Sequence, residues 1–160
     1  HLSNNVVHSD SLYEHNIAAA SGSWWSLELC TDGTPRGYRI FEVNDTDISW
    51  YYKSQGHPKD YQFRVHRDKE GNIVANVWNY DPTWKVEWFE NEKLQGEMIR
   101  FEGVDPLVEA LCADRTKIKY DWIAPSKTNH LFKAKQKNED ANVTIKVTDR
   151  FGNSYQSTIP

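Results

Sequence analysis

The side chains best suited to bind a metal or to transfer a proton are six histidines, spread along the whole chain. They are His1, His8, His15, His57, His66 and His130. No two of them stand at the helical spacing that brings two imidazoles onto one metal ion, and no HExxH, GxSxG, P-loop or GxGxxG motif occurs. We therefore expect no catalytic residue and no metal site in this chain. His1 alone could be the last residue of a longer metal-binding motif.

Acidic residues and cysteines offer no stronger chemistry. The acidic stretch at 44–47 lacks the spacing of an EF-hand calcium loop, so we interpret it as a turn. Cys30 and Cys112 do not have the spacing of a zinc site. They form either one disulfide or two separate buried thiols, and the sequence leaves both alternatives open.

Aromatic residues are the informative part of the composition, with seven Trp, eight Tyr and six Phe. Trp78, Tyr80 and Trp84 surround a predicted turn, and exposed rings there could stack on sugars. The alternative places these rings in a core, and Trp84 favours it because it shares the strand register of Val86. The chain thus has one candidate ligand-binding group, with core packing as the favoured interpretation.

Alternation of apolar and polar residues predicts the elements that must position these side chains. Residues 37–43 and 46–53 predict a tight hairpin, and residues 142–149 and 154–159 predict another. From about residue 60 onward, short alternating segments separated by turns are typical of an antiparallel sandwich. The expected fold class is mainly β: an antiparallel β-sandwich with one short helix.

That helix is predicted at 105–112, where Asp105 can cap it and Pro106 fits its first position. Residues 124–130 are predicted to form a loop.

The N-terminal part has the weakest pattern. Residues 1–15 are expected to be irregular, and 16–21 and 23–29 are expected to be short strands. In an extended strand, the adjacent Trp24 and Trp25 would point to opposite faces.

The net charge of −4, with 23 acidic and 19 basic residues, gives no basic surface for nucleic acid. No apolar run has the length of a membrane span. These features exclude nucleic acid and a membrane span from the expected partners.

Several long segments carry a resemblance to a known family: AAASGSWW, DGTPRGYRIFEV, TDISWYYKSQG, DYQFR, VANVWNYDPTWKVEWFEN, TNHLFKA and VTIKVTDRFGN. Together they resemble the C-terminal region of bacterial calcineurin-like metallophosphoesterases, a group seen mostly in Bacteroidetes. The resemblance runs from about Asn16 to Ile159.

The resemblance implies a parent protein with a small N-terminal β domain, a central catalytic domain and this C-terminal domain. The central domain would hold two divalent metals in its DxH, GDxxD, GNHD or GNHE, and GHxH motifs. None of these motifs is complete here, although His1 could correspond to the last His of GHxH. We therefore expect no cofactor in this chain, no activity from it alone, and a periplasmic or secreted location.

The resemblance also suggests a division of the chain. Residues 1–53 would form the end or cover of the phosphoesterase sheet, and residues 54–160 the β-sandwich domain.

Three functions remain open from the sequence. The first is an accessory domain that braces the catalytic domain and shapes its substrate cleft, and the second is a module that binds carbohydrate or another surface polymer. The third is a structural remnant without a ligand. An apolar patch within 17–53 would favour docking, whereas a row of exposed rings would favour glycan. The candidate docking residues are Trp24, Trp25, Tyr38, Trp50 and Tyr52.

Overall fold

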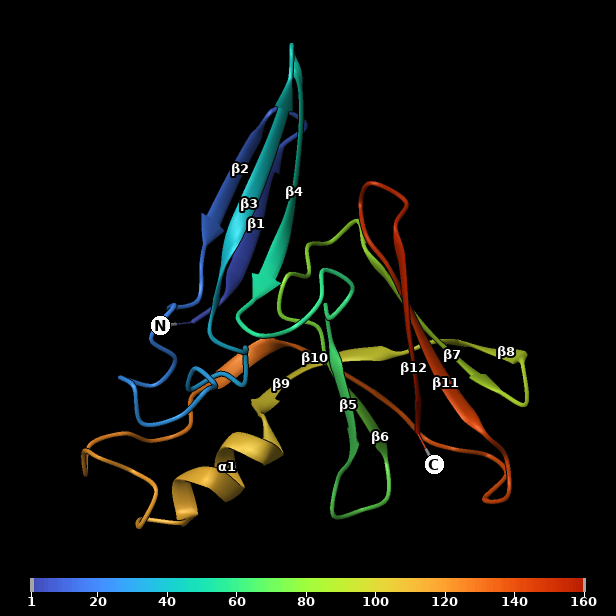
Figure 1. Ribbon diagram of the computed structural model, residues 1–160. Coiled ribbons are helices and arrows are strands. Elements are labelled where there is room, and N and C mark those ends of the chain that lie inside the picture. The colour runs from blue at the N-terminus through green and yellow to red at the C-terminus, as the bar shows by residue number, and fades with distance from the viewer. Residues whose placement is uncertain (1, 160) are drawn as a thin grey trace.

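A computed structural model describes residues 2–159, and within them the fold is mainly β, with twelve strands in four antiparallel sheets and one helix (Figure 1). The predicted fold class is thereby confirmed. The strands are β1 (Asn4–Ser9), β2 (Leu12–Asn16), β3 (Gly37–Asn44), β4 (Asp47–Ser54), β5 (Arg64–Arg67), β6 (Ile73–Asn76), β7 (Lys85–Glu90), β8 (Lys93–Glu97), β9 (Ile99–Val104), β10 (Lys127–Ala134), β11 (Val143–Thr148) and β12 (Ser154–Ile159).

The sandwich consists of two four-stranded sheets, ordered β5-β6-β10-β9 and β12-β11-β7-β8. In β11 the residues alternate between buried and half-buried, as the sequence predicts for a strand with one face on a core. Its apolar side chains Val143, Ile145 and Val147 pack in one cluster with Trp84 and Trp88 of the β7 region. This cluster also includes Ile73 and Phe132 from the opposite sheet, so it forms the core between the two sheets.

Helix α1 (Pro106–Ala113) begins where the sequence predicts. The Asp105 carboxylate accepts hydrogen bonds from the backbone N–H groups of Leu107 and Val108, which satisfies two donors that have no partner within the helix. Pro106 stands in the first turn, where its missing N–H is not needed.

The hairpin pair, β1–β2 and β3–β4, forms two further sheets of two strands each. Together they project from the sandwich as an arm, at the top of Figure 1. The β3–β4 hairpin was predicted, and Asp45 with a φ of 53° takes the left-handed conformation that its tight turn requires. The expectation of irregular structure over residues 1–15 was wrong, because β1 and β2 pair in register from Asn4 with Asn16.

Residues 17–36 correct the predicted strands at 16–21 and 23–29. They form a series of turns with two isolated bridges, Ser23 to Leu27 and Leu29 to Pro35. Trp24 and Trp25 have φ angles of 51° and 57°, in the left-handed region that a strand cannot contain. The apolar residues of this segment favour a strand, but apolar composition does not indicate where the backbone turns left-handed.

Strand β10 begins at Lys127, although the sequence predicts a loop over 124–130. The pairing of β10 with β9 shifts between Thr128 and Leu131. Such an irregularity breaks the alternation of side chains between the two faces, which is the signal that sequence reasoning uses.

Strand β6 is buried on both faces. Ile73 and Ala75 face the sandwich core, whereas Asn76 faces Asp32 in the turn segment 17–36. That segment and α1 therefore form a third layer over the outer face of the sheet β5-β6-β10-β9.

Candidate interdomain surface

Aromatic rings hold the two projecting hairpins together around Trp50. The Trp50 ring of β4 lies 5.2 Å from the Tyr13 ring and 4.8 Å from the His15 ring of β2, centre to centre. The His15 ring also lies 5.5 Å from the Phe41 ring of β3. These contacts bury Trp50 to 7% exposure, so the two hairpins face one another across a small aromatic cluster.

Arg150, in the turn between β11 and β12, fastens this aromatic cluster to the sandwich. Its guanidinium lies 4.4 Å from the Tyr13 ring centre and 5.2 Å from that of Trp50, which are cation–π distances. Its Nη1 is 3.5 Å from Oδ2 of the buried Asp81. The neighbouring Phe151 ring meets Trp50 edge-on at 5.0 Å. One turn of the sandwich thus makes both charged and aromatic contacts with the hairpins.

A second guanidinium, that of Arg39, is buried under the same cluster with 8% exposure. Its Nη2 donates a 2.6 Å hydrogen bond to Oδ1 of Asn79, while its Nε and Nη1 are buried without a hydrogen-bond partner. Burial lowers the pKa of Arg39 to about 10, so it stays charged at neutral pH. Burial first, and then the charges of Arg39 and Arg150, lower the pKa of His15 to about 4, so His15 is neutral.

Beyond this cluster, apolar side chains of the hairpins have little covering them. We call this surface the hairpin face, and its members are Leu12, Phe41, Val43, Ile48 and Phe151. Val43 is 67% exposed and Ile48 53%, although they pair directly across β3 and β4 on the same side as Phe41 and Trp50. A cleft of about 570 Å³ runs along the hairpin face, lined also by Tyr13, His15 and Arg150. The inner side of the hairpins is thus buried around Trp50 and open around Val43 and Ile48.

A buried polar network connects the N-terminal segment to the sandwich. The Asp32 carboxylate accepts from the backbone N–H of Ser3 at 2.6 Å and lies 3.3 Å from Nε2 of His130. The other ring nitrogen of His130 lies 2.7 Å from Oδ1 of Asn76, whose amide nitrogen donates to Asp105 at 2.6 Å. Burial would raise the pKa of Asp32, but its contacts with His130 and the backbone N–H groups outweigh burial and lower it.

This arrangement of Asp32, His130 and Asn76 looks like a hydrolase triad, but it has no access to a substrate. His130 is 2% exposed, and both its ring nitrogens have partners. Arg64 also bonds Asp105 at 2.7 Å, so the network is closed at its far end. Its physical role is to fix the segment 17–36 against β6, β10 and α1.

Two of the predicted docking residues are not at the surface. Tyr52 has no exposed area and its hydroxyl donates to the backbone oxygen of Pro35, and Trp50 is 7% exposed. These two predictions are corrected, because their rings fill the contact of the β3–β4 hairpin with its own chain. Ile48 lies on the same face of the hairpin as both, as the strand alternation predicts.

The other three predicted docking residues reach solvent at separate places. Trp25 is 78% exposed, and Tyr38 is 50% exposed on the outer side of β3. Trp24 is half-buried and its ring meets that of Trp122 edge-on at 4.4 Å. The structure therefore does not gather the five predicted residues into one surface, and their role in docking stays a prediction.

The aromatic residues proposed for ligand binding lie mainly inside. Trp78 is 1% exposed and Trp84 6%, so burial excludes both from stacking on a ligand. Trp84 belongs to the sandwich core, as the alternative interpretation predicts, whereas Trp78 packs with Tyr52 and Cys30 on the other side of β6. Tyr80 is half-buried and lies under the guanidinium of Arg100 at 4.7 Å.

Cys30 and Cys112 are free buried thiols in two different apolar clusters. Burial raises the pKa of the Cys30 thiol to about 12, so it is not an activated nucleophile.

Within residues 2–159, no three His, Cys, Asp or Glu side chains come together as a metal-binding group. His1, the candidate for the end of a GHxH motif, lies outside the described residues.

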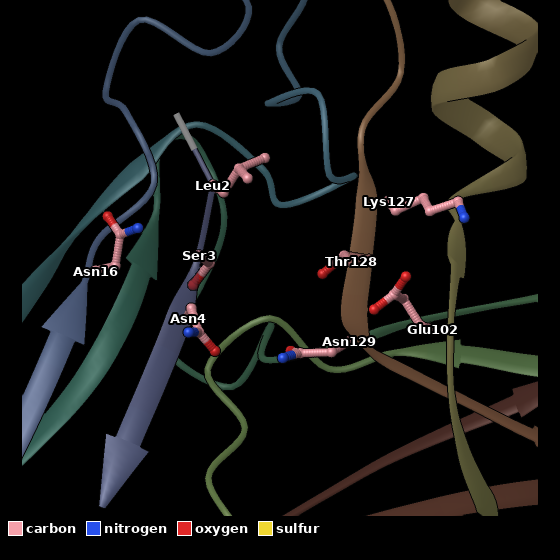
Figure 2. A pocket seen from close by; sticks show the side chains of 8 residues that line it. All are labelled: Leu2, Ser3, Asn4, Asn16, Glu102, Lys127, Thr128 and Asn129. Carbon is pink, nitrogen blue, oxygen red and sulfur yellow. The ribbon is translucent and has the colours of Figure 1, made fainter.

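A small polar pocket lies beside the N-terminal strand. Figure 2 shows it between β1 and β10, with Ser3 and Asn4 on one side and Thr128 and Asn129 on the other. Its volume is about 270 Å³, and Glu102 and Lys127 complete its wall. The polar lining contrasts with the apolar hairpin face, which is the larger opening.

Sequence reasoning missed the residues that form the hairpin face. Val43 and Ile48 were within the predicted hairpin, and their pairing across a two-residue turn would have placed them next to Phe41. For Arg150 and Phe151 the sequence held no such signal, because their contact with the hairpins joins residues more than 90 positions apart in the sequence.

Among the described residues, no helix is long and apolar enough to cross a membrane.

Comparisons with known proteins add the identity of the domain. Neither the curated proteins nor the solved structures provide a match to this chain. Residues 14–155 match a protein-family model described as the C terminal of calcineurin-like phosphoesterase. That match covers most of the chain, and so the chain belongs to the family of C-terminal domains of calcineurin-like phosphoesterases.

Proposed function

We propose that this chain is a non-catalytic accessory domain that braces the catalytic domain of a calcineurin-like phosphoesterase. The observation that carries the proposal is the hairpin face, an apolar surface of the projecting hairpin pair that this chain leaves open. The family description implies a phosphoesterase catalytic domain in the same polypeptide, and that domain is the occupant we assign to the hairpin face.

The hairpins have a physical need for such a partner. A two-stranded hairpin is marginally stable by itself, and three or more strands or a packed face are usually required. Here the aromatic cluster covers only the part of each hairpin around Trp50. Val43 and Ile48 are already partly buried, so covering the rest of each side chain would contribute about 1–2 kcal/mol, before the loss of entropy is subtracted. Exposed patches of this kind mark interfaces.

In this proposal, hydrolysis belongs to the catalytic domain. That domain would hold two divalent metals, whose chemistry is to activate a water for attack on a phosphate ester. The described residues of this chain do not fit such a pair of ions, since no cluster of metal-binding side chains is found among them. The accessory domain would position the catalytic domain and shape one side of its substrate cleft. A bacterial parent of the Bacteroidetes group, in the periplasm or secreted, is part of the same proposal.

The test compares this chain with the two-domain protein in which the catalytic domain precedes it. We expect hydrolysis of a model phosphodiester, bis(4-nitrophenyl) phosphate, only by the two-domain protein. We also expect slower amide hydrogen exchange in β3 and β4 when the catalytic domain is present. The double variant Val43→Ser and Ile48→Ser should remove this extra protection, whereas the same changes at Leu94 and Ile99, which are exposed elsewhere, should not. Equal exchange in both proteins would disprove docking at the hairpin face.

A second candidate function, binding of a glycan, is favoured by one observation. The Trp122 ring is 59% exposed and lies 5.4 Å from the Tyr120 ring, with only 17° between their planes. Tyr120 is half-buried, so the exposed ring of Trp122 is the one that can stack on the apolar face of a sugar. Retention of the chain on insoluble polysaccharides, lost on Trp122→Ala but not on Leu94→Ala, would support this function.

A further inference from the structure

The cleft along the hairpin face combines apolar walls with a positively charged floor. Its walls carry Tyr13, Phe41 and Phe151, and its floor carries Arg150. We infer that the element of the catalytic domain that enters this cleft carries an acidic side chain, which pairs with Arg150 between apolar neighbours. This inference rests on the proposed function, because it names the chemistry of the partner at the same surface.

The charges around the cleft leave an excess of positive charge at its floor. Arg39 and Arg150 are both cationic, and the buried carboxylate of Asp81 lies 3.5 Å from Arg150. The carboxylate of Asp149, next to Arg150 in the sequence, is also buried and accepts from Asn153 and Tyr155. Asp10 also lines the cleft, but it is exposed at the rim, where water screens its charge. One of two deeply placed cations therefore lacks a carboxylate partner.

The hydrogen bonds of the two guanidiniums are incomplete as well. Nε and Nη1 of Arg39 and Nη1 of Arg150 are buried without a hydrogen-bond partner, although Nη1 of Arg150 is near Asp81. Oδ1 of Asp81 accepts from the backbone and side chain of Thr83, and its Oδ2 is the atom that lies near Arg150. Buried cations are normally paired with carboxylates, so this arrangement is suited to an additional anion.

Arg150 is the cation that such an anion can reach. Its side chain is 12% exposed and lines the cleft, whereas Arg39 lies beneath. Tyr13 and Trp50 hold the guanidinium in place, so little freedom is lost when a carboxylate binds it. The apolar walls exclude water from the contact and strengthen it. A neutral apolar segment would instead cover Arg150 without adding a second anion to its 3.5 Å contact with Asp81.

The experiment measures hydrogen exchange of β3 and β4 in the two-domain protein and in the 160-residue chain, for each variant. For each variant, the amide protection in the two-domain protein is divided by the amide protection in the 160-residue chain. This ratio reports docking alone, because the contribution of Arg150 to the chain's own fold affects both values and cancels. We expect Arg150→Gln to lower this ratio at least tenfold and Arg150→Lys, which keeps the charge, to lower it less. Arg67→Gln removes an exposed arginine on β5 and should leave the ratio unchanged.

The outcomes separate this inference from the proposed function. If Val43→Ser lowers the ratio while Arg150→Gln behaves like Arg67→Gln, the hairpin face docks but the acidic contact is wrong. If no variant changes the ratio, docking at this surface fails and the proposed function fails with it.

His15 provides a second readout that a merely structural role of Arg150 would not move. Around His15 lie Asn5 of β1, Tyr13 of β2, Phe41 of β3 and Trp50 of β4, together with the charges of Arg39, Arg150 and Asp81. A carboxylate bound to Arg150 adds a negative charge to this set. Docking also buries His15 more deeply, which lowers its pKa, so a pKa above about 4 in the two-domain protein, followed by NMR of the ring protons, is the signature of the added carboxylate. An unchanged value would contradict the acidic contact.

Discussion

The sandwich and the hairpin pair are both antiparallel β structure, but they differ in how fully the chain buries them. Each sandwich sheet has four strands, and apolar side chains from both sheets form one core. Each hairpin has two strands, and its apolar side is covered only in part, around Trp50, by Arg150 and Phe151. The core of the sandwich therefore lies within this chain, whereas Val43 and Ile48 of the hairpin pair stay exposed.

The sharpest test of this comparison makes one chemical change in both regions. Ile145→Ala in the sandwich core should lower the free energy of unfolding by about 2–5 kcal/mol, through lost burial and a cavity. Ile48→Ala on the hairpin face should change it by less than about 0.5 kcal/mol, since that side chain is mostly in water already. Urea denaturation of both variants measures the difference. Similar losses in the two would mean that the hairpin face is buried in solution, for instance by a second copy of the chain.

The junction between the two regions has its own test at Gly33. This residue has a φ of 85°, and an added Cβ would lie about 2.5 Å from Asn76 and from Asp105. Gly33→Ala should therefore cost about 2–4 kcal/mol, from backbone strain and from displacement of the buried network. Gly152 is the matched control, because its φ is 84° and open space surrounds it. Gly152→Ala should cost about 1 kcal/mol, and an equal cost at both glycines would show that the network tolerates displacement.

Removing the Arg150 side chain should loosen the hairpin pair and spare the sandwich. Arg150→Ala deletes two cation–π contacts and leaves Asp81 without that cation. We expect the local opening free energy of β1–β4 to fall by about 1–3 kcal/mol, with amides of β11 keeping their protection. Hydrogen exchange followed by mass spectrometry distinguishes the two regions. Uniform loss of protection would mean that hairpins and sandwich unfold as one unit.

Acid should weaken the hairpin pair through His15, and burial lowers the pKa of His66 on β5 of the sandwich as well. The pKa of His15 is about 4 in the folded chain and near 6.5 when unfolded, so the unfolded state binds more protons between these values. Stability should be highest above pH 6.5 and fall by about 1–2 kcal/mol as the pH drops toward 4, allowing for solvent screening. His15→Gln should flatten this decline in thermal melts, and His57→Gln, at an exposed position, should not.

The contribution of Asp32 to folding stability changes in a lower pH range. Its pKa is lowered on folding, so its contribution is present above the unfolded value of 3.8 and is lost as the pH falls below that value.

The sandwich could be predicted because its strands alternate strictly, as Val143, Ile145 and Val147 do, and because the capping of α1 by Asp105 is a local signal. Residues 17–36 could not, because the left-handed backbone at Trp24 and Trp25 replaces the periodicity of a strand. The sequence predicts Trp50 and Tyr52 at a docking surface although both are buried, and the reason is related. Large aromatic side chains serve a core and an interface equally well, and only tertiary contacts decide between them.

The bonds at Ser3 have a mechanical consequence. Ser3 is buried, its N–H is held by Asp32, and its hydroxyl donates to the backbone oxygen of Trp78. Tension transmitted along the polypeptide from a preceding domain would reach this anchor before it reached the β1–β2 pairing. The pull would then load two hydrogen bonds together against the body of the sandwich, instead of peeling β1 from β2 one bond at a time. The N-terminal segment is thus anchored to the rest of the domain at a point able to resist force.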